Sequence, residues 1–140
     1  MTGLRGFWRA EGGAVAVYFA LLAPILIAAA ALAAEAGLWL ITERKLQQIA
    51  DAAAYSAAAR SMSTTDTAIL LAAATASATE SGLVATDSLT MHRPPQSGGF
   101  AARSGYVQVE VGRSVARYFT ALFMGTTEPV RITARAVAGT

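Results

Sequence analysis

The acidic side chains are the first candidates for catalytic chemistry, because a positioned carboxylate can exchange protons with a substrate. That chemistry needs a motif that brings such groups together and an environment that tunes their pKa values. The carboxylates beyond the apolar N-terminal third are scattered and belong to no motif, among them Asp51, Glu80, Asp87, Glu110 and Glu128. The sequence therefore predicts a non-enzymatic protein with no catalytic residue.

Metal and nucleophilic chemistry have equally little support. His92 is the single histidine and there is no cysteine, so a histidine metal site, a Ser/His/Asp triad, a thiolate nucleophile and a disulfide framework are not expected. The net charge of +2 is too small and too scattered to suggest nucleic acid. We expect no cofactor, no metal, no nucleic acid and no small-molecule substrate.

Glu35 is the carboxylate with the most unusual position. It directly follows a run without a charged residue, from Ala14 to Ala34. A carboxylate at bilayer depth is a functional hypothesis by default. At the edge of the run, however, the side chain can reach water or lipid headgroups, and we favour this interpretation. Trp39 then falls where an interfacial aromatic residue belongs.

The uncharged run predicts a transmembrane helix over residues 14–41. At about 1.5 Å per residue the run alone is about 30 Å long, which matches the hydrocarbon core of a bilayer. A cleaved secretory signal is the alternative, but the run is longer than the usual core of roughly 7–15 residues. Residues 1–13 carry Arg5 and Arg9 against one acid, and such a flank tends to stay cytoplasmic. We therefore predict a cytoplasmic N-terminus and an extracytoplasmic domain over residues 42–140.

Small residues and one proline suggest that the span packs against other helices. Alanine allows close approach in lipid, where van der Waals contacts drive association, although weak general hydrophobicity explains the same composition. Pro24 removes one backbone hydrogen bond, so we expect a bend there or near Gly37. We assign Pro24, Glu35 and Gly37 to helix packing.

Helix-forming residues continue over residues 42–60. An apolar stripe at spacings of three and four consists of Leu46, Ile49, Ala50 and Ala53. We therefore predict one long helix from the span to about residue 60, with this stripe as its packing surface.

The rest of the sequence predicts a small α+β domain. A second helix is expected over residues 67–80, too short for another span. Alternating residues predict strands within 87–92, 106–112 and 130–137, which make residues 87–138 a sheet region of two or three strands. Residues 93–105 are rich in Pro and Gly and predict an exposed, mobile loop.

A short amphipathic helix is expected between the last two strands, capped by Ser114 and ended by Gly125. Its apolar spacing is that of a helix facing a core. We assign this stripe and the apolar strand faces to the domain core: Val107, Val109, Val111, Phe119, Leu122, Phe123, Val130 and Ile132.

Three groups of residues, taken in order and with their spacing, carry a resemblance to a known family. They are Gly12-Gly13-Ala14 with Phe19 and Pro24, then Glu35-Ala36-Gly37 with Leu46 to Ala54, and finally Val107, Val109, Tyr118-Phe119, Leu122, Gly125 and Ile132 to Ala138. Together they resemble the short members of the TadE/TadG-like family of the tight-adherence (Flp) pilus assembly system.

The resemblance implies a single-pass inner-membrane protein of pilin-like build, with its domain in the periplasm. It implies a pilin-like or pseudopilin role, with membrane lipid and other pilin-like and pilus assembly membrane proteins as partners. It also implies a candidate prepilin-type processing site at Gly12, Gly13 and Ala14.

Two departures from the family modify this picture. Tyr18 stands where TadE-like members usually carry Glu, which is thought to pair with a neighbour's N-terminus. This departure weakens the prediction of processing and filament insertion and moves the resemblance toward TadG. At 140 residues the chain has no room for the von Willebrand-type domain of many TadG-like proteins, so adhesion through such a domain is not expected. The competing hypothesis is a membrane-anchored protein-binding module unrelated to pili, with residues 93–105 as its contact surface.

Overall fold

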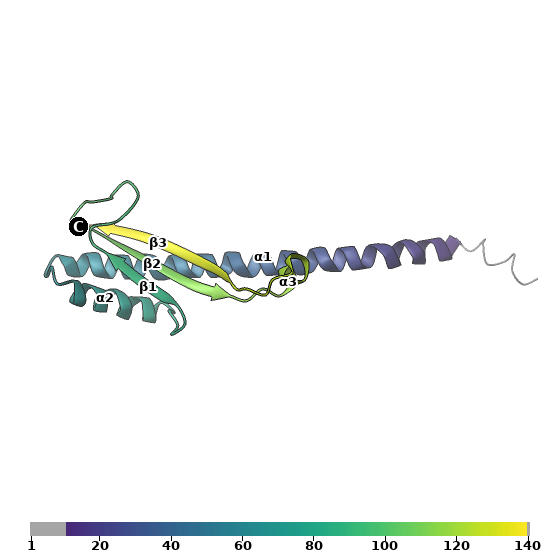
Figure 1. Cartoon of the computed structure of the whole chain (residues 1–140), viewed down its shortest axis with the longest axis horizontal. Helices are drawn as coiled ribbons and strands as arrows, with labels where there is room; N and C mark the ends of the chain where they lie inside the picture. The colour runs from purple at the N-terminus through teal and green to yellow at the C-terminus, as the bar shows by residue number, and fades with distance from the viewer. Residues whose placement is uncertain (1–10, 140) are drawn as a thin grey trace, which may run out of the picture.

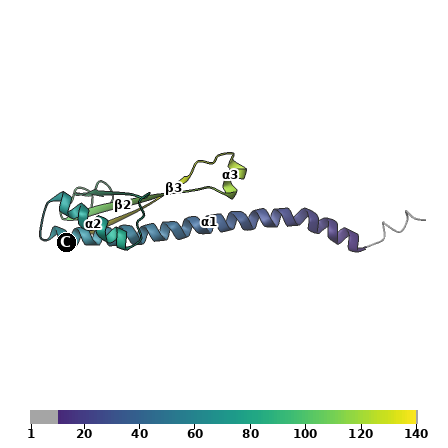
Figure 2. The same ribbon diagram turned by 90° about the horizontal axis from the view of Figure 1, so that it is seen from below.

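Helix α1 (Glu11–Ser61) is a single helix of 51 residues that extends far beyond the rest of the structure (Figure 1). The computed structural model describes residues 11–139, so most of the predicted cytoplasmic segment 1–13 lies outside the described residues. The predicted span and its extension form one helix, as the sequence indicated. Pro24 lies inside α1, and the N-terminal part of α1 curves away from the remaining axis in Figure 2. The hydrogen bond that proline removes accounts for such a bend.

The N-terminal part of α1 has the length and composition to cross a membrane once, which indicates single-pass anchoring. None of its most apolar segment is buried inside the molecule. The C-terminal part behaves differently, because Leu46, Ile49, Ala50 and Ala53 have no exposed surface. One helix therefore has an uncovered apolar half and a half that belongs to the domain core.

Helix α2 (Thr67–Glu80) packs antiparallel against the end of α1. Its first turn is capped by Asp66, whose side chain accepts a hydrogen bond from the Ala68 amide. Two hydroxyls then join the helices: Ser56 Oγ donates to the Ala73 carbonyl at 3.1 Å, and Ser77 Oγ donates to the Ala52 carbonyl at 3.2 Å. The interface is lined with alanine, so the two backbones can approach closely.

Three antiparallel strands form a sheet in the order β1 (Ser88–His92), β2 (Tyr106–Val115) and β3 (Val130–Gly139). One face of β2 and β3 packs on α1. The core of the domain consists of the α1 stripe together with the inward residues of the sheet and α2: Val107, Val109, Val111, Ala134, Ala136, Ala74 and Ala78. Val130 and Ile132 are half-buried.

The connection between β2 and β3 differs from the sequence prediction. Ser114 and Val115, expected to start a helix, extend β2 instead, and Val115 pairs with Val130. The helix α3 is shorter, Phe119–Met124, and it has no buried residue. Phe119, Leu122 and Phe123 are exposed, so their assignment to the domain core was wrong. The physical reason is that the connection carries α3 past the end of the sheet, where only α1 lies beside it (Figure 2).

An ion pair fastens the turn after α2 to β2. Arg113 donates to both carboxylate oxygens of Asp87, at 2.8 Å from Nε and 2.6 Å from Nη2. The Asp87 carboxylate has no exposed surface and also accepts a hydrogen bond from the Val84 amide. The hydrogen bonds from the Arg113 guanidinium hold the pKa of Asp87 below its ordinary value of 3.8.

Because the pKa of Asp87 is depressed, its ion pair stabilises the domain above the ordinary value and this contribution is lost as pH falls through the folded-state pKa. We expect Asp87→Asn to lower the free energy of unfolding by about 1–3 kcal/mol at neutral pH. The difference from wild type should shrink as pH falls from about 5 to below the ordinary pKa of 3.8. Urea unfolding in mild detergent measures both quantities. A constant difference across that range would contradict this origin of the stability.

Ile49 tests the dependence of the domain on α1. Truncation of a fully buried isoleucine leaves a cavity, so Ile49→Ala should cost about 2–5 kcal/mol in unfolding free energy. Met62→Ala is the matched control because Met62 is 78% exposed. Urea unfolding followed by near-ultraviolet circular dichroism reports the tertiary packing. Equal midpoints for the two variants would rule out this packing arrangement.

Candidate functional site

Glu35 lies on α1 directly after the uncharged run, and its side chain is buried, with 2% of its surface exposed. This position contradicts the expectation that Glu35 faces water or headgroups. The residues that cover it come from the β2–β3 connection, which returns along α1 (Figures 1 and 2). A chain segment more than 80 positions away in the sequence therefore supplies its environment.

Four donors surround the Glu35 carboxylate, and all belong to the start of α3. Oε1 accepts from the Tyr118 amide at 2.9 Å and from Thr120 Oγ1 at 3.0 Å. Oε2 accepts from the Phe119 amide at 2.9 Å and from the Thr120 amide at 2.7 Å. Both oxygens are thus satisfied, which is the condition for burying a carboxylate without a large desolvation cost.

The Glu35 side chain, which belongs to α1, caps the N-terminus of α3. The first amides of any helix lack an intrahelical acceptor. Tyr118 occupies the N-cap position but makes no side-chain cap hydrogen bond. The Glu35 carboxylate fills this role and lies at the positive end of the short helix. We call this arrangement of Glu35 with Tyr118, Phe119 and Thr120 the Glu35 clamp.

The Glu35 clamp brings three backbone amides and the Thr120 hydroxyl to one carboxylate. It suits the holding of two segments together rather than proton transfer. Among residues 11–139 no group of three potential metal ligands is found.

Trp39 and Arg117 extend the same contact by one turn of α1. The guanidinium carbon of Arg117 lies 5.9 Å from the centre of the Trp39 ring, a cation–π arrangement. Arg117 also donates to the Glu128 carbonyl at 2.9 Å, and this hydrogen bond joins the two ends of the β2–β3 connection. The connection is therefore held to α1 at two neighbouring points.

The sequence offered one indirect signal for the Glu35 clamp. Tyr118 occupies the N-cap position of α3, where Asp, Asn, Ser or Thr is usual. The first amides of such a helix are left to water or to an acceptor from elsewhere in the chain. Ser114, which the sequence suggested as the cap, lies in β2 and pairs with Arg131.

The other predicted site residues lie apart from the Glu35 clamp. Gly12, Gly13 and Ala14 fall in the first turn of α1, and processing there stays a prediction. Pro24 is exposed. A Cβ atom on Gly37 would meet no atom within 4 Å, so no close contact inside the chain requires this glycine.

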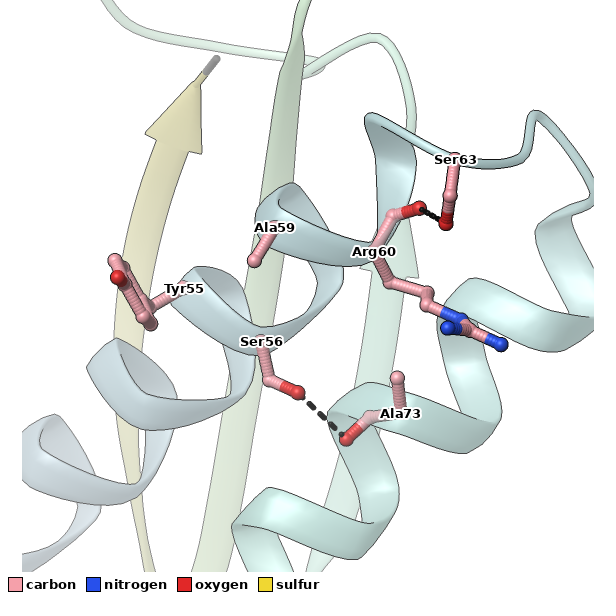
Figure 3. Close-up of a pocket in the computed structure, with 6 residues that line it drawn as sticks. All are labelled: Tyr55, Ser56, Ala59, Arg60, Ser63 and Ala73. Carbon is pink, nitrogen blue, oxygen red and sulfur yellow. Dashed lines mark hydrogen bonds between the residues drawn. The ribbon is translucent and has the colours of Figure 1, made fainter.

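A shallow depression lies at the far end of α1. It lies between α1 and α2 and is lined by Tyr55, Ser56, Ala59, Arg60, Ser63 and Ala73 (Figure 3). Its two serine hydroxyls already donate to backbone carbonyls, Ser56 to Ala73 and Ser63 to Arg60. The Tyr55 hydroxyl and the Arg60 guanidinium are the remaining polar side-chain groups of its lining.

Removal of the carboxylate should release α3. In Glu35→Ala we expect the Tyr118, Phe119 and Thr120 amides to exchange hydrogen roughly tenfold faster or more, because each loses a charged acceptor. Glu35→Gln keeps one acceptor oxygen and should give an intermediate rate. Hydrogen exchange of the full chain in detergent measures this, with Glu43→Ala as the control from an exposed position of α1. Unchanged exchange in Glu35→Ala would exclude the clamp.

Comparison with known proteins adds one finding. Residues 13–59 match the family model described as TadE-like protein. This range covers nearly all of α1, including Glu35, and it confirms the resemblance to the TadE/TadG-like family. No curated protein and no solved structure matches the chain.

Proposed function

We propose, from the TadE-like match over residues 13–59, that this protein is a non-enzymatic, membrane-anchored, pilin-like or pseudopilin component of a tight-adherence (Flp-type) pilus assembly or secretion apparatus. The match itself suggests a protein associated with Tad pili. The finer role, in which α1 packs among other pilin-like and pilus assembly membrane proteins, is our proposal.

The observation that carries the proposal is the uncovered apolar half of α1, which lies within the family match. Its exposed side chains point in every direction around the helix: Val15, Val17, Tyr18, Phe19, Leu21, Leu22, Ile25, Leu26 and Ile27. Such a surface needs lipid or other helices around it. Small residues alternate with these large ones, which favours close helix neighbours as well as lipid.

We place the N-terminus in the cytoplasm and the domain outside the inner membrane, because the flank before α1 is net positive. Tyr18 is exposed and offers no carboxylate to a neighbouring N-terminus. We therefore propose a role of α1 within the membrane during assembly, rather than standard insertion into the filament.

A span replacement separates helix packing from simple anchoring. In a host that makes these pili, deletion of the gene should reduce piliation and surface adhesion, and the wild-type chain should restore both. A chain whose residues 14–34 are replaced by a leucine-rich span of equal length should reach the membrane and fold its domain without restoring piliation. Deletion without an effect on piliation would contradict the pilus role. Restoration of piliation by the chain with the leucine-rich span would show that α1 acts as an anchor and not through packing against other helices.

The alternative function is a membrane-anchored protein-binding module that uses the loop over residues 93–105. This loop makes two contacts with β2. The Phe100 and Tyr106 rings stack with centroids 4.4 Å apart, and the Gln96 amide donates to Gln108 Oε1 at 3.1 Å. Co-purification distinguishes the two: pilus ATPase and platform proteins support the pilus role, whereas unrelated proteins that depend on Phe100 support the alternative.

A further inference from the structure

Helix α3 and the residue before it present an apolar surface that nothing in the domain covers. The exposed residues are Tyr118, Phe119, Leu122, Phe123 and Met124. Leu122 is 86% exposed, and α3 contains no charged residue. Single exposed apolar residues are ordinary on a protein surface, but a continuous group of large ones indicates an interaction surface.

The Glu35 clamp fixes the height of this surface along α1. Tyr118, Phe119 and Thr120 are all bonded to Glu35, the residue that directly follows the uncharged run. That run is about 30 Å long, so when it fills the hydrocarbon core Glu35 falls at its boundary. The start of α3 must fall at the same boundary. Both views place α3 beside α1 and away from α2 (Figures 1 and 2).

We propose that α3 is a second membrane contact, which inserts its exposed apolar side chains into the interfacial region of the leaflet where α1 emerges. This inference rests on membrane anchoring by α1, which belongs to the proposed function, and not on the pilus role.

Continuity with the surface of α1 selects lipid as the occupant. Leu38, Leu40 and Ile41 are exposed on α1 just beyond Glu35, so apolar surface from two elements meets at one height. The aromatic residues of the α3 surface, and Trp39 beside them, are of the type enriched at membrane interfaces. Arg117, which precedes this surface, holds its guanidinium over the ring of Trp39, so a cation flanks the apolar residues at this height. Apolar residues with a flanking cation are typical of interfacial anchors.

The Glu35 clamp also explains how a carboxylate can occupy this boundary. An unpaired carboxylate near the hydrocarbon is costly. Here α3 provides all four hydrogen bonds to it and covers it from lipid. Glu35 thus sets the depth of α3, and α3 shields the charge of Glu35.

Site-specific labelling tests the proposal. The chain has no cysteine, so an introduced cysteine is the single site that a thiol-reactive fluorophore can label. Leu122→Cys carries an environment-sensitive fluorophore in the full chain, reconstituted in vesicles of phosphatidylcholine and phosphatidylglycerol. Met62→Cys, in the turn that follows the far end of α1 and 78% exposed, is the water-exposed control. Leu26→Cys, in the apolar run, is the membrane control. Spin-labelled lipids quench a fluorophore according to its depth.

We expect a blue-shifted emission at Leu122→Cys and severalfold stronger quenching by shallow acyl-chain labels than at Met62→Cys. Quenching at Leu26→Cys with a water-like signal at Leu122→Cys would overturn the proposal while leaving the anchor intact. No quenching at either position would contradict membrane anchoring by α1, and the proposal with it. A third outcome is a blue shift that occurs without lipid quenching and disappears when the protein is diluted in lipid. That result would mean that a second copy of the chain covers the surface, and it would overturn the proposal.

Adding Glu35→Ala to Leu122→Cys tests the positioning by Glu35. Quenching at Leu122→Cys should fall, while quenching at Leu26→Cys in the same background should not change. Unaltered quenching at both positions would show that Glu35 does not set the depth of α3.

Discussion

The structure depends on one constraint: α1 has to meet two different environments without interruption. Over its N-terminal half every side of the helix is apolar and uncovered, and over its C-terminal half one stripe forms the centre of the domain core. The domain of about 100 residues has a small core of its own and is marginal without this stripe. Because α1 is continuous, the position of the domain relative to the membrane follows from the helix.

Glu35 lies where the two environments meet, and it links them. Its carboxylate, together with the neighbouring Trp39–Arg117 contact, joins α1 to the connection between β2 and β3. The bonds replace water at a position where water is scarce and give α3 the acceptor that its own sequence does not supply. The exposed surface of α3 is therefore a consequence of the same contact that buries the charge.

Elements with a strong local pattern were predicted closely. The alternation of Val107, Val109 and Val111 indicated a strand with one buried face, and the stripe through Leu46 and Ile49 indicated a helix face that packs. The aromatic residues of α3 were assigned to the wrong environment. Helical spacing identifies an apolar side, but it does not say whether a core or a membrane covers that side.

The sequence by itself determined the length of the apolar run, the continuity of α1, the strand segments and the absence of a catalytic pattern. These features depend on neighbouring residues, through hydropathy, periodicity and helix propensity. Only the tertiary structure decided what surrounds Glu35 and what α3 exposes. The donors to Glu35 lie 83 to 85 residues away in the sequence, and a contact of that separation depends on strand pairing and on the path of the β2–β3 connection, which no local pattern encodes.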